Sequence, residues 1–489
     1  MHPKTKIPPK PKGNDGFRGN KKKKNMAKVQ QISDMTKQIP FTEYDFYQIY
    51  EKSFEKSELG RIKSLIPLTE MAMRMGLKQT NPSARKRRGR KSYFSPEGKI
   101  ALLYLKMYTG ESAPKLMEQL NANIHYQLFC GIRIRPDRPL TNYKLLNDSF
   151  EELADLLKIK ELQFVLADKW RPLLKNLDTV YMDGTCYESV MRYPTDVKLL
   201  WESIEKAYAM MVSIAHQLGE HRMRTKYIDI AKDRLAYVKQ RKHTKEDTRH
   251  ITQRMLALLG KLLNEIRRQQ RKHPQIDLLK KKELVDLETI TKVYRQQKNH
   301  FESSDAKESI PDRIVSINKP YVRPIVRGKE VKQVEFGAKC NNVIVDGISF
   351  IDKLSFNAFN EGKCLKSGIK YIERLLKTKI KKVGGDQGYS SNENRKFCAT
   401  KGIVTSFAPK GKANLTDPGK TQIRKELARV RATTMEGSFG TQKEHYNLKR
   451  VNARRKKTEI LLIFFGIHTA NAVLLAKRVA AQEKNQKAA

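Results

Sequence analysis

The chain has 489 residues, of which 98 are Lys or Arg and 52 are Asp or Glu, so its formal net charge is +46. A charge of this size attracts polyanions and releases their counterions on binding, which favours nucleic acid as the partner. The five cysteines form no C-x-x-C pair and the ten histidines no H-x-x-x-H pair, so neither a disulfide framework nor a zinc site is indicated.

Neither secretion nor a membrane role is indicated. The first residues, MHPKTKIPPKPKGN, lack the apolar core of a signal peptide. The longest apolar stretch, residues 460–476, contains His468, Thr469 and Asn471 and is shorter than the ~20 residues that a spanning helix needs. We therefore expect a buried core helix there, and a protein of a reducing cytoplasm.

The N-terminal third divides into an arm and a helical domain. Residues 1–40 are rich in Lys, Pro and Gly and predict a basic, disordered arm, which either grips phosphates or only solubilises the chain. Residues 41–175 place apolar side chains at three- and four-residue spacing, and Ser95 is expected to cap a helix. The basic run Arg85, Lys86, Arg87 and Arg88 interrupts them. We expect a helical DNA-binding domain, with a merely solvated basic face as the alternative.

Strand-like and helical patterns alternate in the rest of the chain. Residues 176–196 and 305–476 carry short apolar runs and a DG turn at Asp346 and Gly347, which predict an α/β domain with a mixed sheet. Residues 197–304 between them are amphipathic helices, which we interpret as a helical insertion. In that insertion Trp201 could stack a flipped base, but a core position is favoured. Residues 477–489 form a tail.

Acidic residues at strand ends in a basic chain suggest metal-dependent cutting of a polyanion. Asp183 lies in DTVYMDGT, Asp386 in KKVGGDQGYSS and Glu436 in RVRATTMEGSFG. Clustered carboxylates repel one another and need a cation, and two divalent ions ~4 Å apart stabilise both the attacking and the leaving oxygen of a phosphodiester. Mg²⁺ prefers oxygen ligands, so we expect two Mg²⁺ ions, with Mn²⁺ as a substitute. Pattern alone leaves other acids open, namely Asp178, Asp196, Asp346, Asp352, Glu188 and Glu335.

Three segments sharpen the choice. The sequences RPIVRGKEVKQVEFGAK, GGDQGYSS and MEGSFGTQKEHYNLKR resemble the catalytic domain of bacterial insertion-sequence transposases of the DDE, ribonuclease-H-like type. The resemblance covers roughly residues 90–475. It implies that Asp183, in a D-G-T context, supplies the first acid, that Asp386, in D-x-G-Y, supplies the second, and that Glu436, in E-x-x-F-G, supplies the third. It also implies a ribonuclease-H-like sheet.

The chain departs from the family pattern at two points. Some members carry Y-x2-R-x3-E-x6-K around the third acid; here Glu436 and Lys443 fit, but Ala432 stands at the Arg position, Arg429 at the Tyr position, and Arg431 is offset by one. The helical insertion also separates the first two acids widely.

Basic and aromatic residues near the acids are candidates for DNA contact. Lys443 lies two turns after Glu436 on nearly the same helical face and could hold a phosphate. We expect Tyr446 and Arg450 to continue that face, and Arg323, Arg327 and Lys329 to line the DNA channel. A solvated basic helix or loop is the alternative for all six.

The resemblance implies a DNA transposase, associated with the nucleoid in the bacterial cytoplasm. Such an enzyme acts as an endonuclease at the element ends and transfers the released strand into target DNA, with double-stranded DNA and a second copy of the chain as partners. Two alternatives remain: a ribonuclease-H-like nuclease without strand transfer, and a domesticated DNA-binding protein. The presence of all three acids argues against the second.

Overall fold

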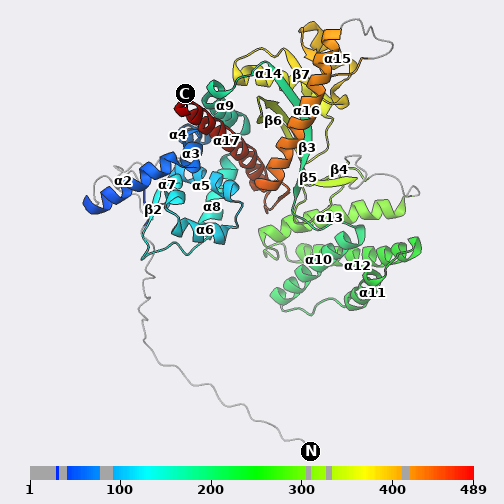
Figure 1. Cartoon of the computed structure of the whole chain (residues 1–489). Helices are drawn as coiled ribbons and strands as arrows, with labels where there is room; N and C mark the ends of the chain where they lie inside the picture. Colours follow the sequence, from blue (N-terminus) through cyan, green and yellow to red (C-terminus); the bar gives the residue numbers. More distant parts are fainter. Residues whose placement is uncertain are drawn as a thin grey trace, which may run out of the picture.

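The computed structural model describes residues 29–31, 41–77, 92–303, 310–326, 333–409 and 418–488. It is a mixed α/β structure with a helical N-terminal region, a mixed sheet, and a set of helices that projects from it (Figure 1). The segments 21–24 and 85–88, which carry two of the basic runs, lie outside the described residues.

The N-terminal region is helical, as predicted. The elements are α2 (Phe41–Lys56), α3 (Glu58–Ser64), α4 (Leu68–Met75), α5 (Pro96–Thr109), α6 (Ala113–Ala122), α7 (Ile124–Cys130), α8 (Lys144–Leu156), α9 (Ile159–Trp170) and the short η1 (Arg171–Leu173). Ser95 caps α5 by accepting a hydrogen bond from the Gly98 amide, which confirms the predicted cap. Asn123 separates α6 from α7 by ending one helix and capping the next.

Three residues of the predicted arm form a strand. Residues 29–31 form strand β1 (Val29–Gln31), which pairs antiparallel with β2 (Ile132–Ile134). Ile132 and Ile134 are buried and hold β2 in place. The backbone groups along the edge of β2 can therefore pair with residues of the arm. The remainder of residues 1–40 lies outside the described part of the chain.

The sheet is built around the long strand β3 (Thr179–Ser189). The other strands are β4 (Pro324–Val326), β5 (Val334–Val345), β6 (Ile348–Ser355), β7 (Lys382–Gly384), β8 (Val404–Thr405) and β9 (Arg450–Val451). β5 pairs antiparallel with β3 on one edge, while β7 and then β8 add in parallel on the other. The hairpin of β5 and β6 turns at Asp346 and Gly347, both at positive φ, as the DG signal predicted.

Helices cover both faces of this sheet. Gly368 of α14 (Leu365–Leu376) packs on Met182, so α14 covers the face to which Met182 points. Asp183 points to the opposite face because side chains alternate along a strand. There α16 (Pro418–His445) lies along β3, β7 and β8 (Figure 1). The small helix α15 (Asn392–Thr400) connects β7 to β8.

The last helix, α17 (Lys456–Ala488), joins the helical region to the sheet. It packs against α3, α5 and α8 and against β6, and one continuous hydrophobic core runs through all of them. Among the described residues it is the one helix long and apolar enough to cross a membrane, but 89% of its most apolar window is buried inside the protein. It is therefore the buried core helix that the sequence predicted.

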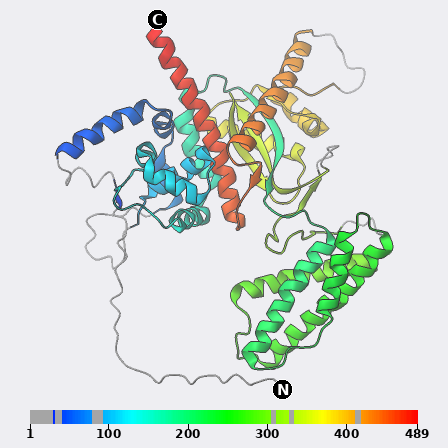
Figure 2. The same cartoon turned by 60° about the horizontal axis from the view of Figure 1, so that its bottom comes forward.

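Four helices between β3 and β4 form a separate body (Figure 2). They are α10 (Asp196–Leu218), α11 (Tyr227–Lys239), α12 (Lys245–Lys272) and α13 (Lys281–Glu302). Their apolar side chains make a hydrophobic core distinct from that of the sheet. Trp201 is buried in this second core and stacks on Tyr227, so it is a core residue and not a platform for a flipped base.

Candidate functional site

A gap in the sheet exposes the edge of β3 at Asp183. On that edge β7 pairs only with residues 179–181 and β9 only with Glu188 and Ser189, so no strand among the described residues pairs with the stretch between. The other edge of Asp183 is paired with Asn342 of β5. The carboxylate is thus fixed by a central strand but remains accessible from the side where β7 ends.

Asp386 enters this gap from the turn after β7. Ser406 fixes Gly385, the residue before Asp386. The Ser406 hydroxyl accepts a hydrogen bond from the Gly385 amide at 2.9 Å and donates one to the Gly385 carbonyl at 2.7 Å. Asp386 then begins the short helix η3 (Gln387–Tyr389). A Cβ at Gly388 would lie 3.0 Å from the Asp386 carboxylate, so glycine leaves room for that side chain.

Glu361, which the sequence analysis did not select, supplies the third carboxylate of the gap. It begins the short helix η2 (Glu361–Cys364) after β6, and its Oε1 lies 2.8 Å from the Lys339 ammonium. A Cβ on Gly184 would lie 2.2 Å from the Glu361 carboxyl carbon, so any side chain there would displace it. The glycine beside Asp183 therefore makes space for a second acid.

Asp183, Glu361 and Asp386 each place an oxygen within 4.8 Å of the others'. Arg431 of α16 pairs with Asp183 and lies 3.9 Å from Asp386. Burial raises the pKa of Asp183 to about 6, because Arg431 offsets only part of the desolvation and the two neighbouring carboxylates oppose ionisation. With Arg431 and Lys339 counted, the five groups carry one formal negative charge.

The donor set fits a hard divalent cation. Its three side chains offer only oxygen, the donor that Mg²⁺ and Mn²⁺ accept. The Oδ1 atom of Asp386 is buried and has no hydrogen-bond partner, which is costly for a carboxylate oxygen unless a ligand reaches it. We therefore conclude that the residues present suit a divalent metal.

Two segments of the chain match protein-family models. Residues 383–469 match the family described as Transposase DDE domain, and residues 48–151 match the Transposase domain (DUF772). This pair of domains is typical of bacterial insertion-sequence transposases. The two matched domains indicate a transposase function. No significant match is found among curated proteins or among solved structures.

The DDE domain match covers only part of the acidic group. It contains Asp386, Arg431 and Glu436 but begins after Asp183 and Glu361. The DUF772 match spans most of the N-terminal helices, from within α2 to α8.

Glu436 lies apart from the three acids that converge. It is exposed on α16 and does not belong to the acidic group found among the described residues. The sheet-facing side of α16 carries Arg431, Met435 and Gln442, of which the last two are buried. Glu436 is five residues after Arg431, which at 100° per residue turns it about 140° away from that side. Lys443 shares the side of Glu436, as predicted.

Tyr446 and Arg450 do not continue this helical face, so that part of the prediction is wrong. α16 ends at His445, and Asn447 takes a left-handed conformation with φ 57°. The chain then turns back into β9, where Arg450 is exposed beside Glu188. Tyr446 is buried in the main core, and burial raises its pKa to about 12.

Of the three basic residues predicted in the RPIVRGK loop, only Arg323 is described. Its guanidinium donates to the carbonyls of Pro320 at 2.6 Å and Val322 at 3.1 Å, so it stiffens the approach to β4. Arg327 and Lys329, like Arg85, Lys86, Arg87 and Arg88, lie outside the described residues, and their contact with DNA stays a prediction.

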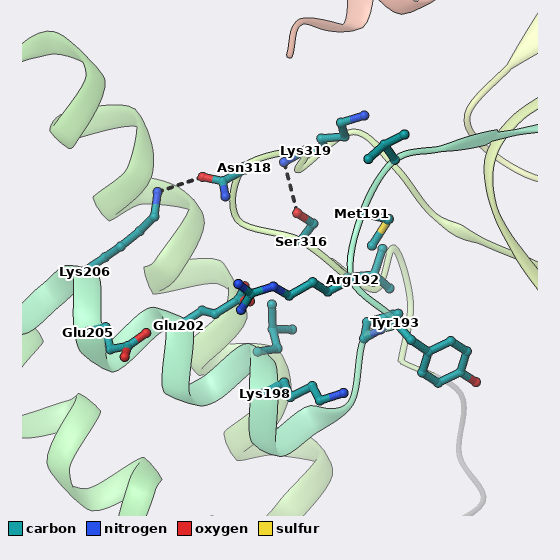
Figure 3. Close-up of a pocket in the computed structure, with 14 residues that line it drawn as sticks. Met191, Arg192, Tyr193, Lys198, Glu202, Glu205, Lys206, Ser316, Asn318 and Lys319 are labelled. Carbon is teal, nitrogen blue, oxygen red and sulfur yellow. Dashed lines mark hydrogen bonds and ion pairs between the residues drawn. The ribbon is translucent and has the colours of Figure 1, made fainter. Parts of the chain in front are cut away.

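A pocket of about 560 Å³ lies where the helices between β3 and β4 join the sheet (Figure 3). Lys206 donates a hydrogen bond to Asn318 there at 3.0 Å, and the Arg192 side chain extends toward Glu202, with 3.9 Å between their charged groups. None of the three converging acids lines it. It is a junction between two bodies, separate from the acidic site.

Little in the sequence could have indicated Glu361. In the run NEGKC it follows Asn360, whose side chain accepts from the Gly362 amide, and such a residue reads as an ordinary helix-start acid. The one usable signal is Gly184, because a glycine inside a strand often marks the close approach of another group.

Proposed function

We propose that this transposase cleaves DNA at the ends of its element and joins the released 3′-hydroxyl to target DNA by metal-dependent phosphoryl transfer. The observation that supports this most is the convergence of Asp183 and Asp386, with Glu361, at the gap beside β3. The match to a transposase DDE domain around Asp386 supports it independently.

We also assign the sheet to the ribonuclease-H-like type. Read across the sheet, β6, β5, β3, β7 and β8 form a run in which β5 alone is antiparallel to its neighbours. The first acid lies on the central strand and the second follows the adjacent parallel strand, so both reach the same edge.

In the proposed reaction Asp183 and Asp386 would hold Mg²⁺, or Mn²⁺ in its place. When bound, a pair of such ions would supply an activated water and stabilise charge on the attacking and leaving oxygens. Arg431 and Lys339 neutralise part of the acidic charge while DNA is absent. The basic arm, the run Arg85–Arg88, Lys443 and Arg450 would contact phosphates, and two copies of the chain would pair two element ends in the cytoplasm.

Two residues compete for the role of third acid. Glu361 is supported by its position in the acidic group, and Glu436 by the E-x6-K spacing to Lys443. The variants Glu361→Gln and Glu436→Gln distinguish them, because only the metal ligand should weaken Mn²⁺ binding in the DNA-free protein. A loss of cleavage in Glu436→Gln with unchanged Mn²⁺ affinity would assign Glu436 to the DNA-bound state.

A strand-transfer assay tests the function. The full chain is incubated with Mg²⁺, a labelled duplex containing the DNA that flanks its gene, and a target plasmid. We expect labelled ends joined to the plasmid, and no product from Asp183→Asn. Cut ends without joined product would show a nuclease, and DNA binding without cutting would show a domesticated binding protein. Asp178→Asn, at the start of the same strand region, is the matched control.

A further inference from the structure

The turns that carry Glu361 and Asp386 reach the gap from different parts of the fold. The first follows β6 and the second follows β7, and these strands are separated in the sheet by β5 and β3. No sheet hydrogen bonds therefore link the two turns. Their relative position depends on whatever contacts the turns make directly.

The backbones of the two turns touch. A Cβ added to Gly362 would lie 2.3 Å from the carbonyl oxygen of Gly388, so the approach allows no side chain at that point. This contact limits how near the turns can come. It does not keep them from separating.

Asn394 holds the two turns together by hydrogen bonds. Its side-chain amide nitrogen donates to the Gly362 carbonyl at 2.7 Å and to the Tyr389 carbonyl at 2.9 Å, and so bridges both turns. Asn394 is 4% exposed, and its backbone N–H donates a hydrogen bond to the Ser391 hydroxyl at the start of α15. A buried amide that bonds to two backbone carbonyls is expensive to remove, because the Tyr389 carbonyl would lose this donor and the Gly362 carbonyl would keep only the Leu365 N–H.

We propose that Asn394 is a positioning residue of the acidic site, which fastens the Glu361 turn to the Asp386 turn and so sets the separation of their carboxylates. This inference rests on the proposed metal-dependent function. Metal ligands must be held to about 0.5 Å, and outer contacts that orient ligands are commonly worth 10- to 100-fold in metal affinity.

The test compares Asn394→Ala with Asn471→Ala in the full chain. Asn471 is also buried, and its amide also donates to a backbone carbonyl, that of Ser349, but it lies in the α17 interface with β6. Mn²⁺ affinity is measured without DNA by electron paramagnetic resonance, and cleavage is measured against Mn²⁺ concentration. We expect Asn394→Ala to bind Mn²⁺ 10- to 100-fold more weakly and to recover cleavage at high Mn²⁺. Asn471→Ala should lower the thermal midpoint and leave Mn²⁺ affinity unchanged.

A second variant covers the case in which Asn394→Ala fails to fold. Gly362→Ala keeps Asn394 but pushes the turns apart, so it should weaken Mn²⁺ binding in the same way. Unchanged Mn²⁺ affinity in a folded Asn394→Ala, or in Gly362→Ala where Asn394→Ala does not fold, would overturn the positioning role while the proposed function stands. Absence of Mn²⁺ binding by the unaltered chain would overturn both.

Discussion

Two carboxylate sites along β3 differ in whether their charge is satisfied. At the C-terminal end of the strand, Glu459 of α17 is fully buried and accepts from Ser189, from Tyr321 at 2.7 Å and from Lys319 at 3.4 Å. In the middle of the strand, Asp386 keeps a buried oxygen without a partner, and Asp183 has a raised pKa.

The difference separates a structural site from a functional one. A buried carboxylate whose hydrogen bonds are complete fixes the elements that surround it. A group of carboxylates that the protein leaves incompletely paired lowers the stability of the metal-free state and retains affinity for a cation. The comparison can be tested by changing each site and measuring both activity and stability.

The largest effect should be on catalysis. Asp183→Asn and Asp386→Asn should each lower the cleavage rate by about a thousandfold or more, because metal stabilisation of the transition state is worth several kcal/mol. Binding of DNA in a gel-shift assay should persist or tighten. Glu459→Gln, which keeps the shape of the structural site, should cleave at a rate within a few-fold of the original. Equal losses of cleavage rate in all three variants would contradict the distinction between a structural and a functional carboxylate site.

The next effect should be on folding. Glu459→Ala should lower the free energy of unfolding by about 3–5 kcal/mol, since it leaves the buried Lys319 ammonium without its carboxylate. Asp386→Ala should cost less than about 1 kcal/mol, since that side chain is 39% exposed and incompletely paired. Denaturant titration of the metal-free proteins measures both, and an Asp386→Ala as unstable as Glu459→Ala would contradict the comparison.

Mn²⁺ should stabilise the folded protein only by binding to the acidic group of Asp183, Glu361 and Asp386. At a concentration 100 times the dissociation constant, Mn²⁺ should raise the free energy of unfolding by about 2.7 kcal/mol. The gain should vanish in Asp386→Asn and remain in Glu459→Gln. Differential scanning calorimetry with and without Mn²⁺ gives the comparison; stabilisation of Asp386→Asn would place the ion elsewhere.

The smallest effect concerns pH. The pKa of Asp183 rises from 3.8 to about 6 on folding, so the folded state holds a proton that the unfolded state has lost between these values. Stability contributed by this group should therefore fall as pH rises from 4 to 6, by on the order of 2 kcal/mol, in metal-free protein. Asp183→Asn should remove that slope and be the more stable protein at pH 7. An unchanged slope would assign the titration to another group.

Local patterns predicted much of the fold. The DG turn, the Ser95 cap and the buried helix α17 depend on residues close together in the sequence, and all three are confirmed. The helical face after Glu436 was extended too far because periodicity does not reveal a turn such as that at Asn447.

The site was predicted only where a motif reported it. D-G-T and D-x-G-Y selected Asp183 and Asp386, which the structure brings together. Glu361 and Asn394 could not be predicted, because their roles depend on contacts between turns that are distant in the sequence. Arg431, offset from the family pattern, gained a partner only when α16 was placed over β3.

The hydrogen bonds of Glu459 also explain how the sheet can accommodate a large insertion between β3 and β4. The chain leaves β3 at Ser189 and returns through Lys319 and Tyr321, and one carboxylate of α17 holds all three. The segment that leaves β3 and the segment that leads back to β4 are thus held together at Glu459, whatever the length of the chain between them. Because the entropic cost of closing a loop grows only logarithmically with its length, such a junction can accept insertions of very different size with little strain on the strands. The position between β3 and β4 is accordingly where the chain can be shortened, lengthened or fused to another domain.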